Sequence, residues 1–197
     1  MLLNNKTGAA QSLDDYFRER LTICSEVLQP PPHEDTLWYL GNMLARFGRS
    51  DHFFSFDDGS ISLRPLALLY NDAREAGSEH ERCLLLRHLG DISLFLGALF
   101  PESYARRGIR KDYFVGMGGG AYDYLAGNAK KNRHIFSELA QWFTRLLQLI
   151  SQACCKENLF DATDILNLYQ RWQISRDPLA ARQLQAVGIV VLDDHLQ

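Results

Sequence analysis

Three residues near the middle of the chain place chemically useful groups within about one turn of a predicted helix. Arg87 lies four residues before Asp91 and His88 lies three before it, so all three side chains can share one side of that helix. A carboxylate beside an imidazole can orient the ring for general-base catalysis. The same carboxylate, if it is buried, must instead be neutralised by donors from neighbouring helices. The sequence leaves a structural anchor, a ligand or catalytic pocket and a metal site as alternatives for these residues.

A second candidate is the segment 106–133, which is both glycine-rich and the most basic part of the chain. Seven Lys or Arg residues stand there against two Asp, so the segment carries +5 and the rest of the chain carries −8. Bare backbone N–H groups in a glycine loop, together with arginines, can hold a phosphate or carboxylate group. The residues that fit this role are Arg106, Arg107, Arg110, Gly116, Gly118, Gly119, Gly120 and Tyr122.

Three interpretations of the glycines compete. They can form an anion-binding loop, lie inside a helix that another helix approaches closely, or belong to a flexible lid. In the helical interpretation Gly116, Gly120 and Tyr124 share one face, and packing must offset a cost of about 1 kcal/mol for each glycine. The order Gly116-x-Gly118-x-x-Ala121 matches a dinucleotide-binding fingerprint, but no parallel sheet is predicted around it. The sequence does not decide between loop and helix here.

Other motifs that carry chemistry are missing from the sequence. The six histidines form neither HxxxH nor HExxH, and the four cysteines form no CxxC pair. We therefore expect no metal and no other cofactor. Neither a GxSxG nucleophile motif nor a Walker A sequence occurs, so the sequence assigns no catalytic residue.

The composition is that of an ordinary globular protein. Apolar residues make up 46% of the 197 positions, and the formal net charge is −3. This charge balance argues against general nucleic-acid binding, which depends on a strong positive field. The chain has neither a run of about 18 apolar residues for a membrane span nor the basic and apolar start of a signal peptide. We expect a cytoplasmic protein without membrane contact.

Apolar residues recur at intervals of three or four along most of the chain, which predicts helices. The clearest stripe consists of Leu85, Leu89, Ile92, Leu96 and Leu99. A capping box beginning at Ser78 should start this helix, and Pro101 should end it. Its second half, 92–100, is apolar on nearly every side and is therefore predicted to be surrounded by other helices.

The expected fold class is an all-α bundle of about seven or eight helices. We expect one domain over 1–197 with a flexible N-terminus at 1–11, and one long helix over 132–156. Residues 53–63 alternate between apolar and polar around an Asp-Gly pair, a pattern typical of a short β-hairpin. An irregular loop is the alternative for that segment.

Four short motifs follow one another in the middle of the chain. They are LGDISLFLG at 89–97, FPES at 100–103, YFVGMG at 113–118 and the pair Ala121-Tyr122. Over roughly residues 80–150 the chain resembles a group of uncharacterised bacterial all-helical proteins of similar length. The resemblance implies a bacterial cytoplasmic protein and brings no activity, cofactor or catalytic residue with it.

Two functions are compatible with these observations. The first is a non-enzymatic cytoplasmic module that binds a partner protein or a small ligand, because no catalytic motif is assembled. The second is an enzyme or sensor for a small phosphate- or carboxylate-bearing molecule, which would use the segment 106–133 together with Arg87, His88 and Asp91. A nucleic-acid contact through the basic segment is a third idea, and a homodimer is expected for either function.

Overall fold

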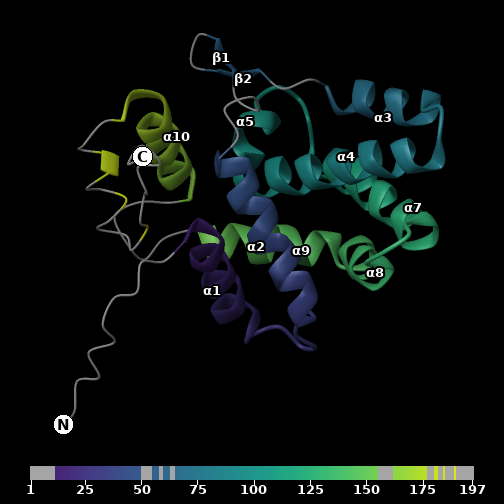
Figure 1. Ribbon diagram of the computed structural model, residues 1–197, viewed down its shortest axis with the longest axis horizontal. Helices are drawn as coiled ribbons and strands as arrows, with labels where there is room; N and C mark the ends of the chain where they lie inside the picture. The colour runs from purple at the N-terminus through teal and green to yellow at the C-terminus, as the bar shows by residue number, and fades with distance from the viewer. Residues whose placement is uncertain are drawn as a thin grey trace, which may run out of the picture.

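The computed structural model describes residues 12–49, 55–57, 60–62, 65–154 and 162–176, together with Ala180, Ala181, Leu184 and Ile189. Within these residues the chain is almost entirely helical (Figure 1), which confirms the predicted all-α class. The N-terminus at 1–11, predicted to be flexible, lies outside the described residues.

The helices follow one another along the chain with short connections. They are α1 (Leu13–Ser25), α2 (Glu34–Arg49), α3 (Leu66–Glu75), α4 (Glu79–Leu99), α5 (Pro101–Ala105), α6 (Lys111–Phe114), the π-helix η1 (Val115–Gly119), α7 (Gly120–Asn128), α8 (Arg133–Gln141), α9 (Phe143–Cys154) and α10 (Ala162–Ser175). Strands β1 (Ser55–Asp57) and β2 (Ser60–Ser62) pair antiparallel within residues 53–63, where the sequence leaves a hairpin and an irregular loop as alternatives. None of the described helices has the length and apolar character needed to cross a membrane.

Side chains satisfy first-turn backbone donors of both α1 and α4, and the sequence predicts the cap of α4 at Ser78. The Ser78 hydroxyl accepts a hydrogen bond from the Glu81 N–H at 3.2 Å, and the Glu81 carboxylate accepts one from the Gly77 N–H at 3.1 Å. At α1, the Ser12 hydroxyl accepts from the Asp15 N–H at 3.2 Å. These caps define where the two helices begin.

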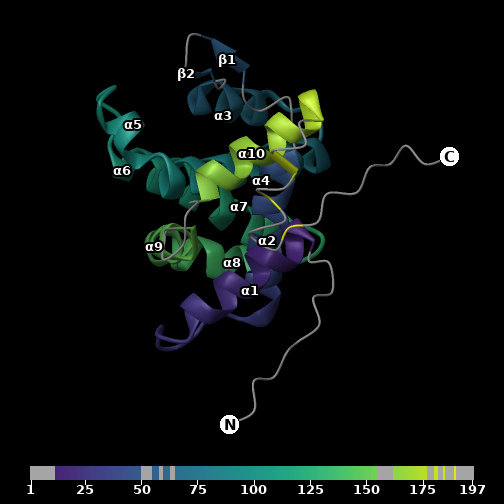
Figure 2. The same ribbon diagram turned by 90° about the vertical axis from the view of Figure 1, so that its left-hand side faces the viewer.

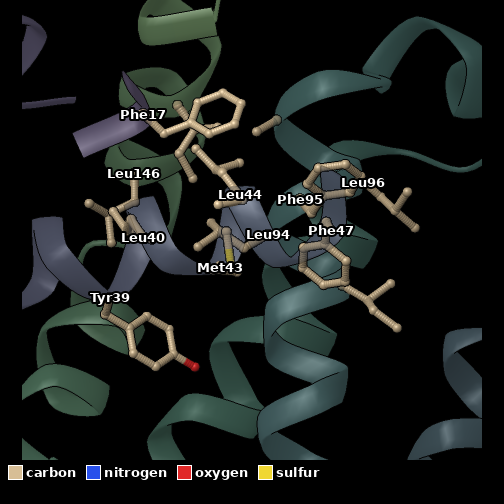
Figure 3. Close-up of a cluster of buried hydrophobic side chains, with 14 of the residues drawn as sticks. Phe17, Tyr39, Leu40, Met43, Leu44, Phe47, Leu94, Phe95, Leu96 and Leu146 are labelled. Carbon is tan, nitrogen blue, oxygen red and sulfur yellow. The ribbon is translucent and has the colours of Figure 1, made fainter. Parts of the chain in front are cut away.

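Helix α4 lies at the centre of the packing. In both Figure 1 and Figure 2, α3 runs above it, and α7 and α9 run below it. Every residue from 91 to 98 is buried, which confirms the prediction that the second half of this helix is surrounded. Figure 3 shows the apolar side chains of α2 and α4 meeting in one cluster, where the rings of Phe47 and Phe95 lie 4.6 Å apart between centroids.

The glycine-rich segment is helical. Residues 111–128 form one continuous helical run in which η1 is a wider, π-type turn between α6 and α7. The helical interpretation of the glycines is therefore confirmed, and the loop and lid interpretations are wrong for this segment. The buried face of the run consists of Phe114, Gly118, Ala121, Tyr122 and Leu125.

Among the four glycines of residues 116–120, Gly118 is the one that permits close packing against neighbouring helices. A Cβ at Gly118 would lie 2.4 Å from Cζ of Phe143 and 2.7 Å from Cβ of Ser93. A Cβ at Gly116 or Gly120 would have no atom of a neighbouring described element within 4 Å. The predicted packing face through Gly116 and Gly120 is therefore wrong, because the large apolar residues of the segment determine which side is buried.

The single helix predicted over 132–156 is two helices. Trp142, with φ −107° and ψ 15°, separates α8 from α9. The apolar spacing of Leu139, Phe143 and Leu146 continues across this break. Hydrophobic periodicity therefore cannot reveal the break, because it records which side of the chain is buried and not the backbone angles of one residue.

Replacing Gly118 with Ala should lower the free energy of unfolding by about 1–3 kcal/mol, because the methyl group overlaps a buried ring. Gly120→Ala is the matched control. Gly120 has ordinary helical angles (φ −62°, ψ −37°) and open space, so this change should raise the free energy of unfolding by about 0.4–1 kcal/mol. Urea titrations measure both effects, and equal stabilities of the two variants would contradict this packing.

Candidate functional site

A buried carboxylate lies at the middle of α4. Asp91 has no exposed surface, and its two oxygens accept three hydrogen bonds. Oδ1 accepts from the Tyr39 hydroxyl at 2.5 Å and from the Tyr122 hydroxyl at 2.8 Å. Oδ2 accepts from Nη2 of Arg46, which also forms an ion pair with it. Helices α2, α4 and α7 therefore meet at one negative charge, and that charge is paired, as burial requires.

Tyr122 reaches this carboxylate because Gly90 has no side chain. A Cβ at Gly90 would lie 2.7 Å from Cε1 and 2.9 Å from Cζ of the Tyr122 ring. The ring of Phe136 also packs against Tyr122, stacked on its ring with 6.1 Å between the centroids. Packing against Gly90 and Phe136 therefore fixes the position of the Tyr122 ring independently of the hydrogen bond of its hydroxyl.

Arg87 extends the network from the core toward the surface. Its Nε donates to the Tyr39 hydroxyl at 3.1 Å, and its guanidinium carbon lies 5.1 Å from the centre of the Tyr39 ring. Figure 3 shows that the Tyr39 hydroxyl points away from the apolar side chains of α2, such as Leu40 and Leu44. The side chain of Arg46 is 49% exposed, and Arg87 is half-buried. Two guanidinium groups thus converge beside one carboxylate at the edge of the core.

This network carries a net positive charge at neutral pH. Burial, followed by the nearby Asp91 charge, raises the pKa of both Tyr39 and Tyr122 well above the ordinary value, so both phenols are neutral. Burial lowers the pKa of His88, against the opposing effect of Asp91, so its imidazole is neutral at pH 7. The remaining charges are those of two arginines and one carboxylate.

An open cleft of about 610 Å³ lies beside the network, between α2, α4 and the start of α8. The polar side chains that line it are Glu34, Asp35, Asn42, Arg46, Arg87, Asn132 and His134. Trp38, Tyr39, Met43 and Ile135 form its apolar part, and all of these except Trp38 are buried.

The charges of the cleft are ordered along α2. Glu34 and Asp35 lie at the start of the helix, and Arg46 lies about 18 Å further along its axis. Nε2 of His134 lies 2.9 Å from a carboxylate oxygen of Asp35 at the acidic end. The opposite end is basic, since Arg46 and Arg87 both line it.

Only part of the predicted site comes together in the structure. Asp91 and Tyr122 share a hydrogen bond, Arg87 lines the cleft, and His88 is half-buried one residue further along α4. None of the other seven candidates lines the cleft. They are Arg106, Arg107, Arg110, Gly116, Gly118, Gly119 and Gly120.

The basic residues of the segment 106–133 form two separate groups. Arg106, Arg107 and Arg110 are exposed around the turn between α5 and α6, whereas the other group lies beyond α7. The helical run between the groups is about 27 Å long, and Figures 1 and 2 both place α5 far from α8. The positive charge of the segment is therefore not one site.

Two residues of the network, Tyr39 and Arg46, are absent from the sequence-based candidates. They lie seven residues apart on α2, with Met43 between them, and this spacing places all three on one side of a helix. That Tyr39 and Arg46 lie on the same side of a helix could therefore be predicted from the sequence. Only the structure shows that this side of α2 meets Asp91.

Comparison with known proteins brings no relative: no protein-family model, curated protein or solved structure matches the chain. The resemblance to bacterial helical proteins therefore gains no support from these comparisons. Among the described residues, no group of three or more His, Cys, Asp or Glu side chains is placed to hold a metal ion. The function rests on the geometry of the cleft and of the network beneath it.

Replacing Asp91 with Ala should lower the free energy of unfolding by about 3–5 kcal/mol, because it leaves two buried hydroxyls and an arginine without their acceptor. Tyr122→Phe removes a single hydrogen bond and should cost about 1.5–3 kcal/mol. Asp14→Ala is the control, since it removes only a partly exposed ion pair with Arg49 and should cost less than about 1 kcal/mol. Urea unfolding ranks the three variants. If Tyr122→Phe costs no more than Asp14→Ala, the network is not a stabilising anchor.

Acidification should destabilise the protein through His88. Because the pKa of its imidazole is lowered in the folded protein, the unfolded chain takes up the proton first when the pH falls below about 6.5. The stability that the neutral ring contributes is complete above that pH and is lost progressively below it. His88→Gln should therefore flatten the fall of the urea midpoint between about pH 7 and pH 5. His80→Gln, on the exposed first turn of α4, should keep the wild-type pH profile, and identical profiles of the two variants would refute this role.

Proposed function

We propose that this chain is a non-enzymatic binding protein for a small molecule that bears a carboxylate or phosphate group. Arg46 and Arg87 hold this group at the basic end of the cleft. The observation that carries the proposal is the convergence of two guanidinium groups, from two different helices, above a single buried carboxylate.

Both arginines are held in place before a ligand arrives. Arg46 is fixed by its ion pair with Asp91, and Arg87 by the ring and hydroxyl of Tyr39. Side chains that are already ordered lose less entropy on binding. A guanidinium group has five N–H donors, and within the described part of the chain each of these two uses one of them in a hydrogen bond. The remaining donors suit the bidentate geometry of a carboxylate or phosphate.

The start of α8 lies on the acidic side of the cleft, where His134 contacts Asp35. Asn132, directly before this helix, has a left-handed backbone (φ 62°) and makes no capping hydrogen bond with its side chain. Asn132, His134 and Ile135 all line the cleft, so the first turn of α8 lies at its wall. The partial positive charge of this helix N-terminus therefore acts near Asp35 and not beside the two arginines.

Binding is favoured over catalysis by the side chains of the cleft. Among the described residues its lining contains no Ser, Thr, Cys or Lys, and its possible nucleophiles are limited to Glu34, Asp35, Tyr39 and His134. Its imidazole, from His134, lies at the acidic end beside Asp35, away from the two arginines along α2. A ligand held by the arginines would therefore lie far from Glu34, Asp35 and His134, and the nearby Tyr39 hydroxyl already donates to Asp91.

We also propose that the protein is bacterial, acts in the cytoplasm and forms a homodimer. The support for these three statements is the sequence, through its composition and its resemblance to bacterial helical proteins. Light scattering on the purified protein tests the dimer directly, because a monomer and a dimer differ twofold in mass.

Thermal melts test the anion site. Phosphate, citrate or glutamate, compared with chloride at equal ionic strength, should raise the melting temperature, because a ligand that binds the folded state stabilises it by about 2.7 kcal/mol at 100 times its Kd. Arg87→Gln should remove this effect, and Arg87→Lys should restore only part of it, since lysine cannot bind a carboxylate in the bidentate way.

Arg110→Gln is the matched control, because Arg110 is an exposed arginine that does not line the cleft. This variant should respond to the anions as the wild type does. The proposal is wrong if no anion raises the wild-type melting temperature, or if Arg110→Gln abolishes the response while Arg87→Gln keeps it.

A further inference from the structure

A second depression adjoins the cleft on the other side of Trp38. It lies between α1 and α2 and encloses about 840 Å³. Glu34 and Trp38 line both depressions. The two therefore follow one another around the first half of α2 and together form a groove that is longer than a small anion requires.

The second depression differs in chemistry from the cleft. Its apolar side chains are Ile23, Pro31, Pro32, Leu37 and Trp38. Two of them are large and lie open to solvent, since Ile23 is 54% exposed and Trp38 is 48% exposed. Apolar side chains that gather in a surface depression are typical of a binding site, because covering them removes apolar area from water.

The walls of this depression are held in place. The guanidinium group of Arg18 lies 4.7 Å from the centre of the Trp38 ring and covers one of its faces. The loop that carries Pro31 and Pro32 is tied to α8, because both carboxylate oxygens of Glu138 accept from the His33 N–H at 3.2 Å. A depression with fixed walls can bind a ligand without first ordering its own residues.

We propose that the groove binds an extended peptide segment. An acidic side chain of the peptide pairs with Arg46 and Arg87, and an apolar side chain three or four residues away fills the depression beyond Trp38. The proposal rests on the function proposed above, because it uses the same anion site and adds the class of ligand.

The length of the groove fits a short stretch of extended chain. Trp38 and Arg46 are eight residues apart on α2, which corresponds to about 12 Å along the helix axis. Three or four residues of extended peptide span this distance at about 3.3 Å each. Asn42, and Asn132 on the facing wall, provide amide donors and acceptors for a peptide backbone between the two ends.

The charges of the groove also give the peptide a direction. Asp15, Arg18 and Glu19 line the apolar depression, and Asp15 forms an ion pair with Arg18. Glu34 lies where the two depressions meet, so three carboxylates stand against one arginine at this end. These carboxylates would repel an acidic group at that end. The acidic residue of the peptide therefore belongs at the arginines, and its apolar residue belongs beyond Trp38. A fatty acid would satisfy both ends but would leave the two asparagine amides without a polar partner.

Three synthetic peptides test this arrangement by isothermal titration calorimetry. The probe is acetyl-Leu-Ser-Gly-Glu-amide. One comparison peptide replaces its Glu with Gln, and the other replaces its Leu with Gly. We expect the probe to bind at least tenfold more tightly than either comparison peptide, because each comparison peptide loses the group that occupies one end of the groove.

Variants locate the two ends of the bound peptide. Ile23→Ser should weaken binding of the probe at least fivefold and leave the glycine peptide unaffected, whereas Arg87→Gln should weaken both. Leu84→Ser is the matched control, since Leu84 is also 54% exposed but lies on α4 outside both depressions, and it should change neither affinity.

The outcomes separate this proposal from the function on which it rests. If the probe and the glycine peptide bind equally well, or if neither binds while phosphate still raises the melting temperature, the peptide proposal is overturned and the anion site stands. If Arg87→Gln leaves the binding of both acidic peptides unchanged, the anion site is overturned as well.

Discussion

One negative charge, at the start of the buried half of α4, determines how the surrounding helices are arranged. A carboxylate removed from water is tolerated only when it is paired and hydrogen-bonded, and the partners of Asp91 come from α2 and α7. Apolar burial supplies most of the driving force for packing these helices, but it tolerates small shifts of one helix along another. Hydrogen bonds of fixed length do not, so this carboxylate sets the register in which α2 and α7 meet α4.

The same charge shapes the surface of the molecule. Arg46 has a defined position because it forms an ion pair with Asp91. Arg87 has one because its guanidinium group lies over the ring of Tyr39. Two residues of the cleft wall, Arg46 and Arg87, thus belong to a polar network whose other members, such as Asp91 and Tyr122, are buried in the core. Gly90 is buried, so no ligand could touch it, but a side chain there would displace Tyr122. Displacement of Tyr122 would disturb Asp91, which holds Arg46 in place.

The sequence predicts the helices well and the site in part. The ends of α4 follow from local chemistry, because Ser78 caps one end and Pro101 closes the other, and such rules need no knowledge of the rest of the fold. The need of a buried Asp91 for partners could also be predicted. The identity of those partners could not, because Tyr39 and Arg46 are about fifty residues away in the sequence and only tertiary packing brings them close.

The π turn between α6 and α7 contains one residue more than an α-helix of the same height. In a regular α-helix, Tyr122 would lie about 80° around the axis from Phe114, and the additional residue reduces this angle to about 20°. Both rings can therefore enter the core from one helical run. It follows that one residue of this stretch could be deleted without separating the two rings, because the π turn would then become a regular α turn and the angle between them would stay at about 20°. Gly116 and Gly120 have room for side chains, so the length of the stretch and the residues at these two positions both tolerate change.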